Sequence, residues 1–108
     1  MGKGVLLFLK KNIMEILNTT LIKNATQETE NARYTIEYSS SNKVLTRVVV
    51  TIYDKLKTEQ ENPLYVGTIS MDSGYVNCSL SPDFKTGDFF NDFDRILENI
   101  REDIITNS

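Results

Sequence analysis

The segment around Ser73-Gly74 constrains the fold most, because it predicts a hairpin whose register follows from residue types alone. A Ser-Gly pair suits a two-residue loop, since glycine readily adopts the positive φ that such loops require. This loop puts apolar residues on one face of the hairpin and Ser, Thr and Asn on the other, whereas a shift of one residue would mix the faces. The expected cross-strand pairs are Met71 with Val76, Ile69 with Cys78, and Gly67 with Leu80.

An amphipathic helix is predicted to follow this hairpin. Pro82 ends the strand, since proline cannot donate to a strand ladder. Thr86 is a suitable N-cap, and Asp88 falls in the first turn, where the helix dipole favours negative charge. Apolar side chains then recur at steps of three and four residues, which predicts a helix lying across one face of the sheet. This stripe consists of Phe89, Phe93, Ile96, Leu97, Ile100 and Ile104.

Further strands are predicted upstream. Residues 33–39 alternate between apolar and polar side chains, as a half-buried strand does, and residues 39–43 supply a turn. Residues 44–55 are rich in β-branched side chains on both faces, which is typical of a central strand. Residues 64–71 resume the sheet after a polar connector closed by Pro63. Residues 24–31 are polar and without pattern, and are predicted to form a loop.

The N-terminal segment carries two competing periods. An apolar stripe favours a helix over residues 4–17, whereas residues 16–22 also suit a strand. We therefore predict one α+β domain spanning residues 1–108, with residues 1–13 as a flexible or helical extension. Its sheet is mainly antiparallel with four strands, or five. A C-terminal helix packs on one face, and an N-terminal helix completes the fold.

Composition weakens several functional classes. The formal net charge is -3, but residues 1–57 carry nine Lys or Arg against five Asp or Glu, whereas residues 58–108 carry three against ten. An acidic end of this kind repels phosphates and membrane headgroups. The absence of histidine removes the usual general base near neutral pH and a common metal ligand. Cys78 is the single cysteine, so it has no intramolecular partner, and we expect it to be buried on an apolar strand face.

Carboxylates are the remaining candidates for chemistry. Asp88 with Asp92, and Asp94 with Glu98, are helical i,i+4 pairs that could hold Mg²⁺ or Ca²⁺. A metal site normally gathers ligands from several elements, so we interpret all four as a solvated acidic helix face. We expect no catalytic, metal or cofactor residue. A small carboxylate-dependent enzyme stays as an alternative without an acid/base pair.

The sheet face away from the C-terminal helix is the candidate interaction surface. Leu45, Val49, Tyr53 and Val66 would form an apolar patch there, which either an N-terminal helix or a partner would cover. We therefore expect a non-catalytic protein–protein interaction module, whether homodimer, adaptor or inhibitor, that uses this face and the acidic end to bind another protein or itself. The surface residues singled out are Arg33, Leu45, Arg47, Val49, Tyr53 and Tyr75.

Nucleic acid is the alternative partner. Tyr53 and Tyr75 could stack on bases while Arg33, Arg47 and Lys55 meet phosphates. Four antiparallel strands followed by one helix are similar, in topology alone, to the single-strand-binding folds of the Whirly and purine-rich-element-binding type. Bilayer crossing needs about 20 apolar residues, a length that no run in the chain reaches, so we expect a cytoplasmic protein without membrane contact.

Overall fold

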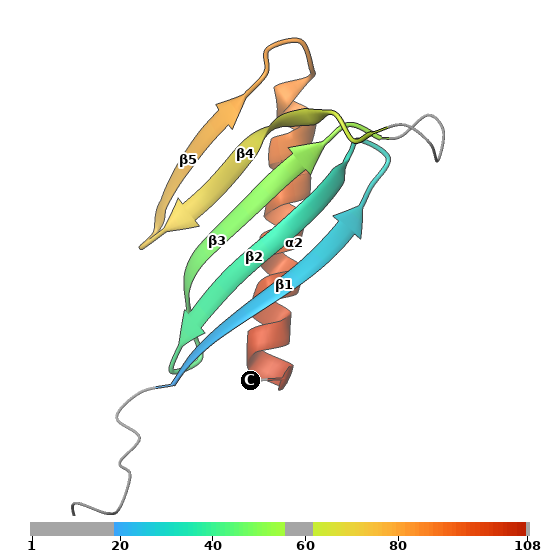
Figure 1. The fold of residues 1–108 in the computed structure, drawn as a ribbon. Coiled ribbons are helices and arrows are strands. Elements are labelled where there is room, and N and C mark those ends of the chain that lie inside the picture. The colour runs from blue at the N-terminus through green and yellow to red at the C-terminus, as the bar shows by residue number, and fades with distance from the viewer. Residues whose placement is uncertain (1–18, 56–61, 108) are drawn as a thin grey trace, which may run out of the picture.

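A computed structural model describes residues 19–55 and 62–107. They form a five-stranded antiparallel sheet in the order β1-β2-β3-β4-β5, followed by one helix (Figure 1). The predicted α+β class is confirmed, with five strands, the larger of the two predicted numbers. The predicted helix over residues 4–17 lies outside the described residues. The elements are β1 (Thr20–Glu28), β2 (Arg33–Ser41), β3 (Val44–Tyr53), β4 (Tyr65–Asp72), β5 (Tyr75–Leu80) and α2 (Thr86–Asn107).

Two tight turns set the register of the sheet. Asn42 and Lys43 join β2 to β3 with φ of 52° and 67°, and Ser73 and Gly74 join β4 to β5 with φ of 52° and 88°. Two successive positive φ values match the right-handed twist of the flanking strands. The hairpin register predicted for β4 and β5 is confirmed at all three of its pairs.

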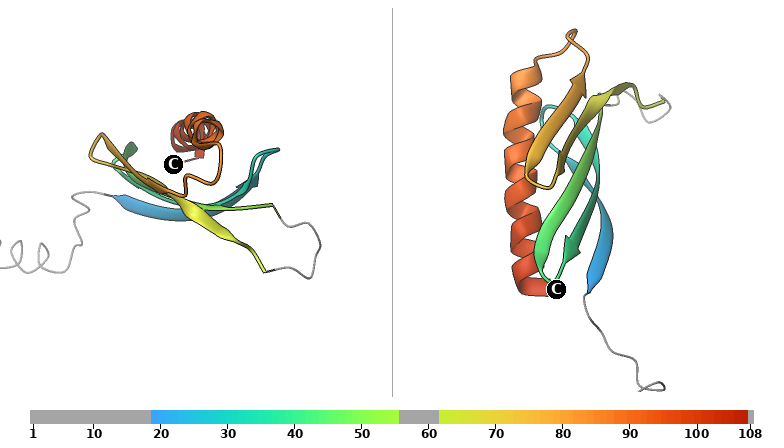
Figure 2. Two further views of the ribbon diagram at one scale, coloured as in Figure 1. Left: turned by 90° about the horizontal axis from the view of Figure 1, so that it is seen from above. Right: turned by 90° about the vertical axis from the view of Figure 1, so that its left-hand side faces the viewer.

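Helix α2 covers one face of the sheet, and the sheet curves around it (Figure 2). The helix begins at Thr86, as predicted, and its apolar stripe is buried except for Leu97, which is half-buried. Burial of these side chains against the sheet is the main source of stability for a helix of this kind. The sheet side of the core consists of Ala32, Tyr34, Ile36, Tyr38, Val48, Val50, Ile52, Val66, Ile69 and Met71.

The loop predicted over residues 24–31 is wrong for most of its length. Strand β1 pairs with β2 from Thr20 to Glu28. Its side chains are mainly exposed, because β1 is an edge strand that α2 covers only in part. A polar edge strand lacks the apolar alternation that identifies a half-buried strand, so pairing with β2 outweighs the weak local pattern.

Two β-bulges change which residues lie on the face that was predicted to be open. The register shifts between Ser39 and Ser40 opposite β3, and again between Ile52 and Tyr53 opposite β4. Each bulge inserts an extra residue and so re-aims a neighbouring side chain. As a result Leu45 packs half-buried against the core and Val66 is buried within it. Both were predicted to lie on the face away from the helix, and for both that placement is wrong.

Candidate functional site

The open face of the sheet is more polar than the sequence predicts. Of the residues singled out there, Val49 and Tyr53 are half-buried, whereas Arg33, Arg47 and Tyr75 are exposed. The register places Arg33 beside Tyr53, and Arg47 lies 4.0 Å from Asp72 in an exposed ion pair. Leu45 is absent from this group because of the first bulge. Among the predicted residues the apolar part is therefore reduced to Val49 and the two tyrosines. The exposed Ile22 and Tyr65 lie on the same face and were not among the predicted surface residues.

A row of hydroxyl side chains crosses this face and was not anticipated. The residues are direct neighbours from strand to strand, and adjacent strands of a sheet lie about 4.8 Å apart. A shallow hollow of about 530 Å³ lies over the part of the row on β1, β2 and β3. The sequence predicts the pair of Thr68 and Ser79 on the polar side of the hairpin, but not the complete row, because the row depends on all four strand registers at once. It consists of Thr26, Thr35, Thr51, Thr68 and Ser79.

Asp92 is the most deeply buried carboxylate among the described residues, at 2% exposed. Its Oδ2 accepts hydrogen bonds from Thr29 Oγ1 at 2.6 Å, Tyr34 OH at 2.5 Å and Asn31 Nδ2 at 3.1 Å. Burial by itself raises the pKa of a carboxyl, but these hydrogen bonds and the charge of Arg95 outweigh it and lower the pKa of Asp92. The predicted placement of Asp92 on a solvated face is wrong. Asp92 instead joins α2 to the β1–β2 turn and the start of β2.

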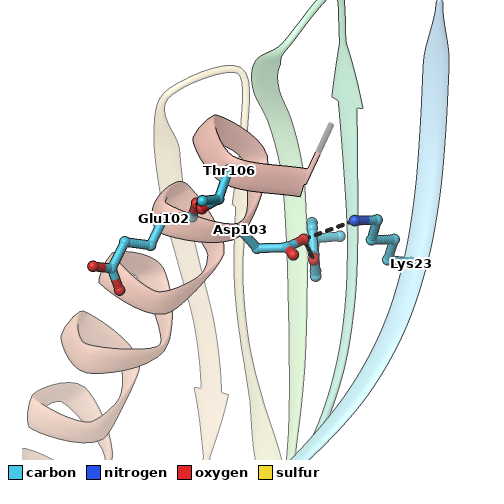
Figure 3. Close-up of polar contacts among 5 residues, drawn as sticks. Lys23, Glu102, Asp103 and Thr106 are labelled. Carbon is cyan, nitrogen blue, oxygen red and sulfur yellow. Dashed lines mark hydrogen bonds and ion pairs between the residues drawn. The ribbon is translucent and has the colours of Figure 1, made fainter.

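A second carboxylate fastens the other end of the same strands. Asp103 accepts hydrogen bonds from Tyr38 and from Lys23, whose Nζ lies 2.9 Å from Asp103 Oδ2. Figure 3 shows Asp103 turned toward β1 and Glu102 turned away from the sheet. Burial and the neighbouring Asp103 raise the pKa of Tyr38 to about 12. Because Asp92 and Asp103 are eleven residues apart on α2, about 16 Å along the axis, they do not form an acid/base pair.

Strand β5 is the region that the core leaves most exposed. Residues Tyr75 to Ser79 are all exposed and Leu80 is half-buried, although Val76, Cys78 and Leu80 belong to the helix-facing row. Cys78 is exposed, so its predicted burial is wrong. The reason is geometric, because α2 lies behind the middle of the sheet and the β4–β5 hairpin projects to one side of it (Figures 1 and 2).

A mainly apolar groove, which Lys43 and Arg101 also line, continues this uncovered region toward the C-terminal end of α2. It has a volume of about 440 Å³ and lies between the tips of the two tight hairpins and the helix. Val44 is 63% exposed and Ile105 is 82% exposed at its rim. Met71, on its floor, is the cross-strand neighbour of Val76. The groove and strand β5 therefore form one continuous surface.

In residues 19–55 and 62–107, no group of three or more Cys, Asp and Glu side chains is arranged to hold a metal ion. No helix in that same part of the chain is long and apolar enough to span a bilayer. Comparison of the chain with protein-family models, curated proteins and solved structures finds no match.

Proposed function

We propose that this chain is a non-catalytic protein–protein interaction module that binds its partner along strand β5. The observation that carries the proposal is an edge strand without a single charged side chain, whose residues are all exposed from Tyr75 to Ser79. Exposed edge strands normally carry charge, proline or a covering element that prevents strand pairing. Strand β5 has none of these protections within its own residues.

The mechanism is addition of a partner strand. An edge strand presents unpaired backbone N–H and C=O groups, which supply affinity when an extended segment of the partner pairs with them. Alternate side chains supply selectivity, here Val76 and Cys78 on one face and Tyr75 and Asn77 on the other. The apolar groove beside Met71 extends the contact, as the apolar centre of an interface does.

The polar contacts that join β1 and β2 to α2 fix the shape of the sheet to which β5 belongs. Asp92 and Asp103 tie β1 and β2 to α2 from both ends, so the sheet is held in one curvature before any partner binds. A preformed strand costs less conformational entropy on binding than one that must first order. The open-face residues Arg33, Arg47, Val49 and Tyr53 then serve as a secondary contact surface.

Capture from an extract of the native host with three immobilised baits tests the proposal. The baits are the wild type, Cys78→Pro, which blocks strand pairing at the edge, and Cys78→Thr, which preserves it. A protein retained by the wild type and Cys78→Thr but lost from Cys78→Pro is the expected result. Equal capture by all three baits would contradict edge binding, as would capture by none of them combined with a wild type that stays monomeric. Circular dichroism of each bait confirms that it is folded.

Single-stranded nucleic acid is the second candidate, favoured by one corner of the open face. Tyr53 and Tyr65 form an edge-to-face pair with centroids 6.2 Å apart, beside Arg33. Such aromatic pairs can stack on bases. However, Glu28 is the cross-strand neighbour of Arg33, which offsets its charge. Fluorescence anisotropy with a labelled oligonucleotide over a salt series tests this candidate. It requires binding that weakens steeply as salt is added and that is lost in Tyr53→Ala.

A further inference from the structure

The backbone groups that β5 presents at its outer edge can be identified from the hairpin register. In a hairpin with a two-residue loop, the residues that flank the loop, here Asp72 and Tyr75, form a hydrogen-bonded pair, and such pairs then recur at every second residue. The hydrogen bond from Ser81 N to Val66 O, at 3.1 Å, continues this alternation. The N–H and C=O groups of Val76, Cys78 and Leu80 therefore point away from β4.

These three residues are spaced symmetrically about Cys78, so an antiparallel second copy of β5 can meet all of them in one register. We propose that β5 pairs antiparallel with β5 of a second copy of this chain, around a twofold axis at Cys78, forming one continuous sheet. The inference rests on the proposed function, because it uses the same edge. In this register Val76 pairs with Leu80 of the second copy, and the two Cys78 residues pair with each other. Three hydrogen-bonded pairs form, with about six hydrogen bonds between them.

The side chains of β5 are complementary to their own symmetry copy. On the helix-facing side, Val76 meets Leu80 of the second copy, so apolar residues meet apolar residues. On the open side, Asn77 meets Ser79 of the second copy, so hydrogen-bonding groups meet each other. Cross-strand pairs of matched chemistry are the main source of side-chain stabilisation between strands.

Charge also favours a second copy. A twofold axis brings each residue near it close to its own copy, so a charged residue there would face a like charge. Strand β5 carries no charge, so it avoids this repulsion. The other edge strand, β1, carries Lys23 and Glu28, which oppose pairing at that side. With one adhesive edge per chain, assembly closes at a dimer instead of growing into a fibre.

Sedimentation of the purified protein over a concentration series tests the dimer. The wild type and Cys78→Thr are expected to form dimers at the same concentration. In Cys78→Pro the outward N–H is replaced by a proline ring, without loss of a hydrogen bond to β4, so the dimer dissociation constant should rise about tenfold or more. Dimers of undiminished stability in folded Cys78→Pro would overturn the inference, as would a monomeric wild type at every concentration.

Cysteine cross-linking tests the register. A hydrogen-bonded antiparallel pair places its Cα atoms about 5.5 Å apart, within the range that a disulfide bridges. Diamide, an azodicarboxamide oxidant, should therefore join two Cys78 thiols of a wild-type dimer, taking up their two hydrogens as it becomes a hydrazine. In Val76→Cys with Cys78→Ser, the new cysteines are separated by four residue steps, about 13 Å along the strand.

Covalent dimer should therefore form at least about tenfold faster in the wild type than in the double variant. Equal rates, or faster reaction of the double variant, would overturn the axis at Cys78. A wild type that stays monomeric refutes the second copy as the partner, but does not refute edge binding. Edge binding is judged separately by whether the host protein captured in the extract experiment is lost from Cys78→Pro.

Discussion

The two edges of this sheet differ in how they are protected. Strand β1 is polar, and its Lys23 points toward the helix layer, where it pairs with Asp103 (Figure 3). Gln27 of the same strand accepts a hydrogen bond from Asn99 of α2 at 3.4 Å. Strand β5 has no charge and is exposed on both faces. Inward-pointing charge is a known protection of edge strands, so the comparison shows that β1 carries such a protection and β5 does not.

Substitution of Asp92 should affect stability most, because this side chain holds the β1–β2 end of the sheet to α2. In Asp92→Ala the donors from Thr29, Asn31 and Tyr34 lose their shared acceptor. A buried donor without a partner, here Tyr34, costs about 1–3 kcal/mol, and the half-buried Thr29 and Asn31 add a smaller cost. We expect a loss of about 3 kcal/mol or more in the free energy of unfolding, measured by urea denaturation. A loss below about 1 kcal/mol would show that this anchor is not what holds β1 and β2 to α2.

The same anchor predicts a pH dependence. The pKa of Asp92 is lowered in the folded chain, so the unfolded chain binds the proton first as pH falls. The stabilisation is therefore complete above the ordinary carboxyl pKa of about 4 and is lost as pH falls below it. Asp92→Asn keeps the size but not the charge, so its stability should fall less between pH 7 and pH 3. Parallel declines in both proteins would contradict this assignment.

The local sequence pattern was sufficient to predict the β4–β5 hairpin and the C-terminal helix, but not which residues the fold buries or exposes around the candidate site. Ser73-Gly74 and the apolar stripe of α2 are encoded by neighbours in sequence, and both were predicted correctly. The two bulges depend on how three strands align, so the burial of Leu45 and Val66 could not be derived. Likewise, Cys78 alternates as a buried residue does, and only the position of α2 leaves it exposed.

Gly67 offers a way to detach the unprotected edge. A Cβ at this position would lie 2.2 Å from Ser79 O and 2.9 Å from Leu80 Cα, both backbone atoms of β5. Gly67→Ala should therefore push β5 away from β4 and cost about 1–3 kcal/mol, as overpacking does. Hydrogen exchange should locate the loss in the amides of Tyr75, Asn77 and Ser79.

Gly74→Ala is the comparison variant, because it has open space around its Cβ but a positive φ. Faster exchange confined to the turn is expected there.

Removal of the inward charge should convert β1 into a second adhesive edge. The Lys23–Asp103 pair is partly exposed, so its loss in Lys23→Val should cost about 0.5 kcal/mol of stability. The larger consequence is in assembly, since two adhesive edges per chain permit open-ended growth. Light scattering should show species larger than a dimer in Lys23→Val, whereas Lys23→Arg, which keeps the charge, should match the wild type. Identical size distributions for Lys23→Val and the wild type would show that Lys23 does not protect this edge.

The reciprocal change places an inward charge on β5 and should alter stability as little as Lys23→Val does. Val76 is 53% exposed, so Val76→Lys should shift the free energy of unfolding by about 0.5 kcal/mol, as most surface substitutions do. In the proposed dimer, however, each new lysine would face the apolar Leu80 of the second copy and lose solvation. Sedimentation should therefore show a monomer at concentrations where Val76→Thr, which keeps the β-branched shape, is a dimer. If Val76→Lys remained dimeric, the association would have to use a surface other than β5.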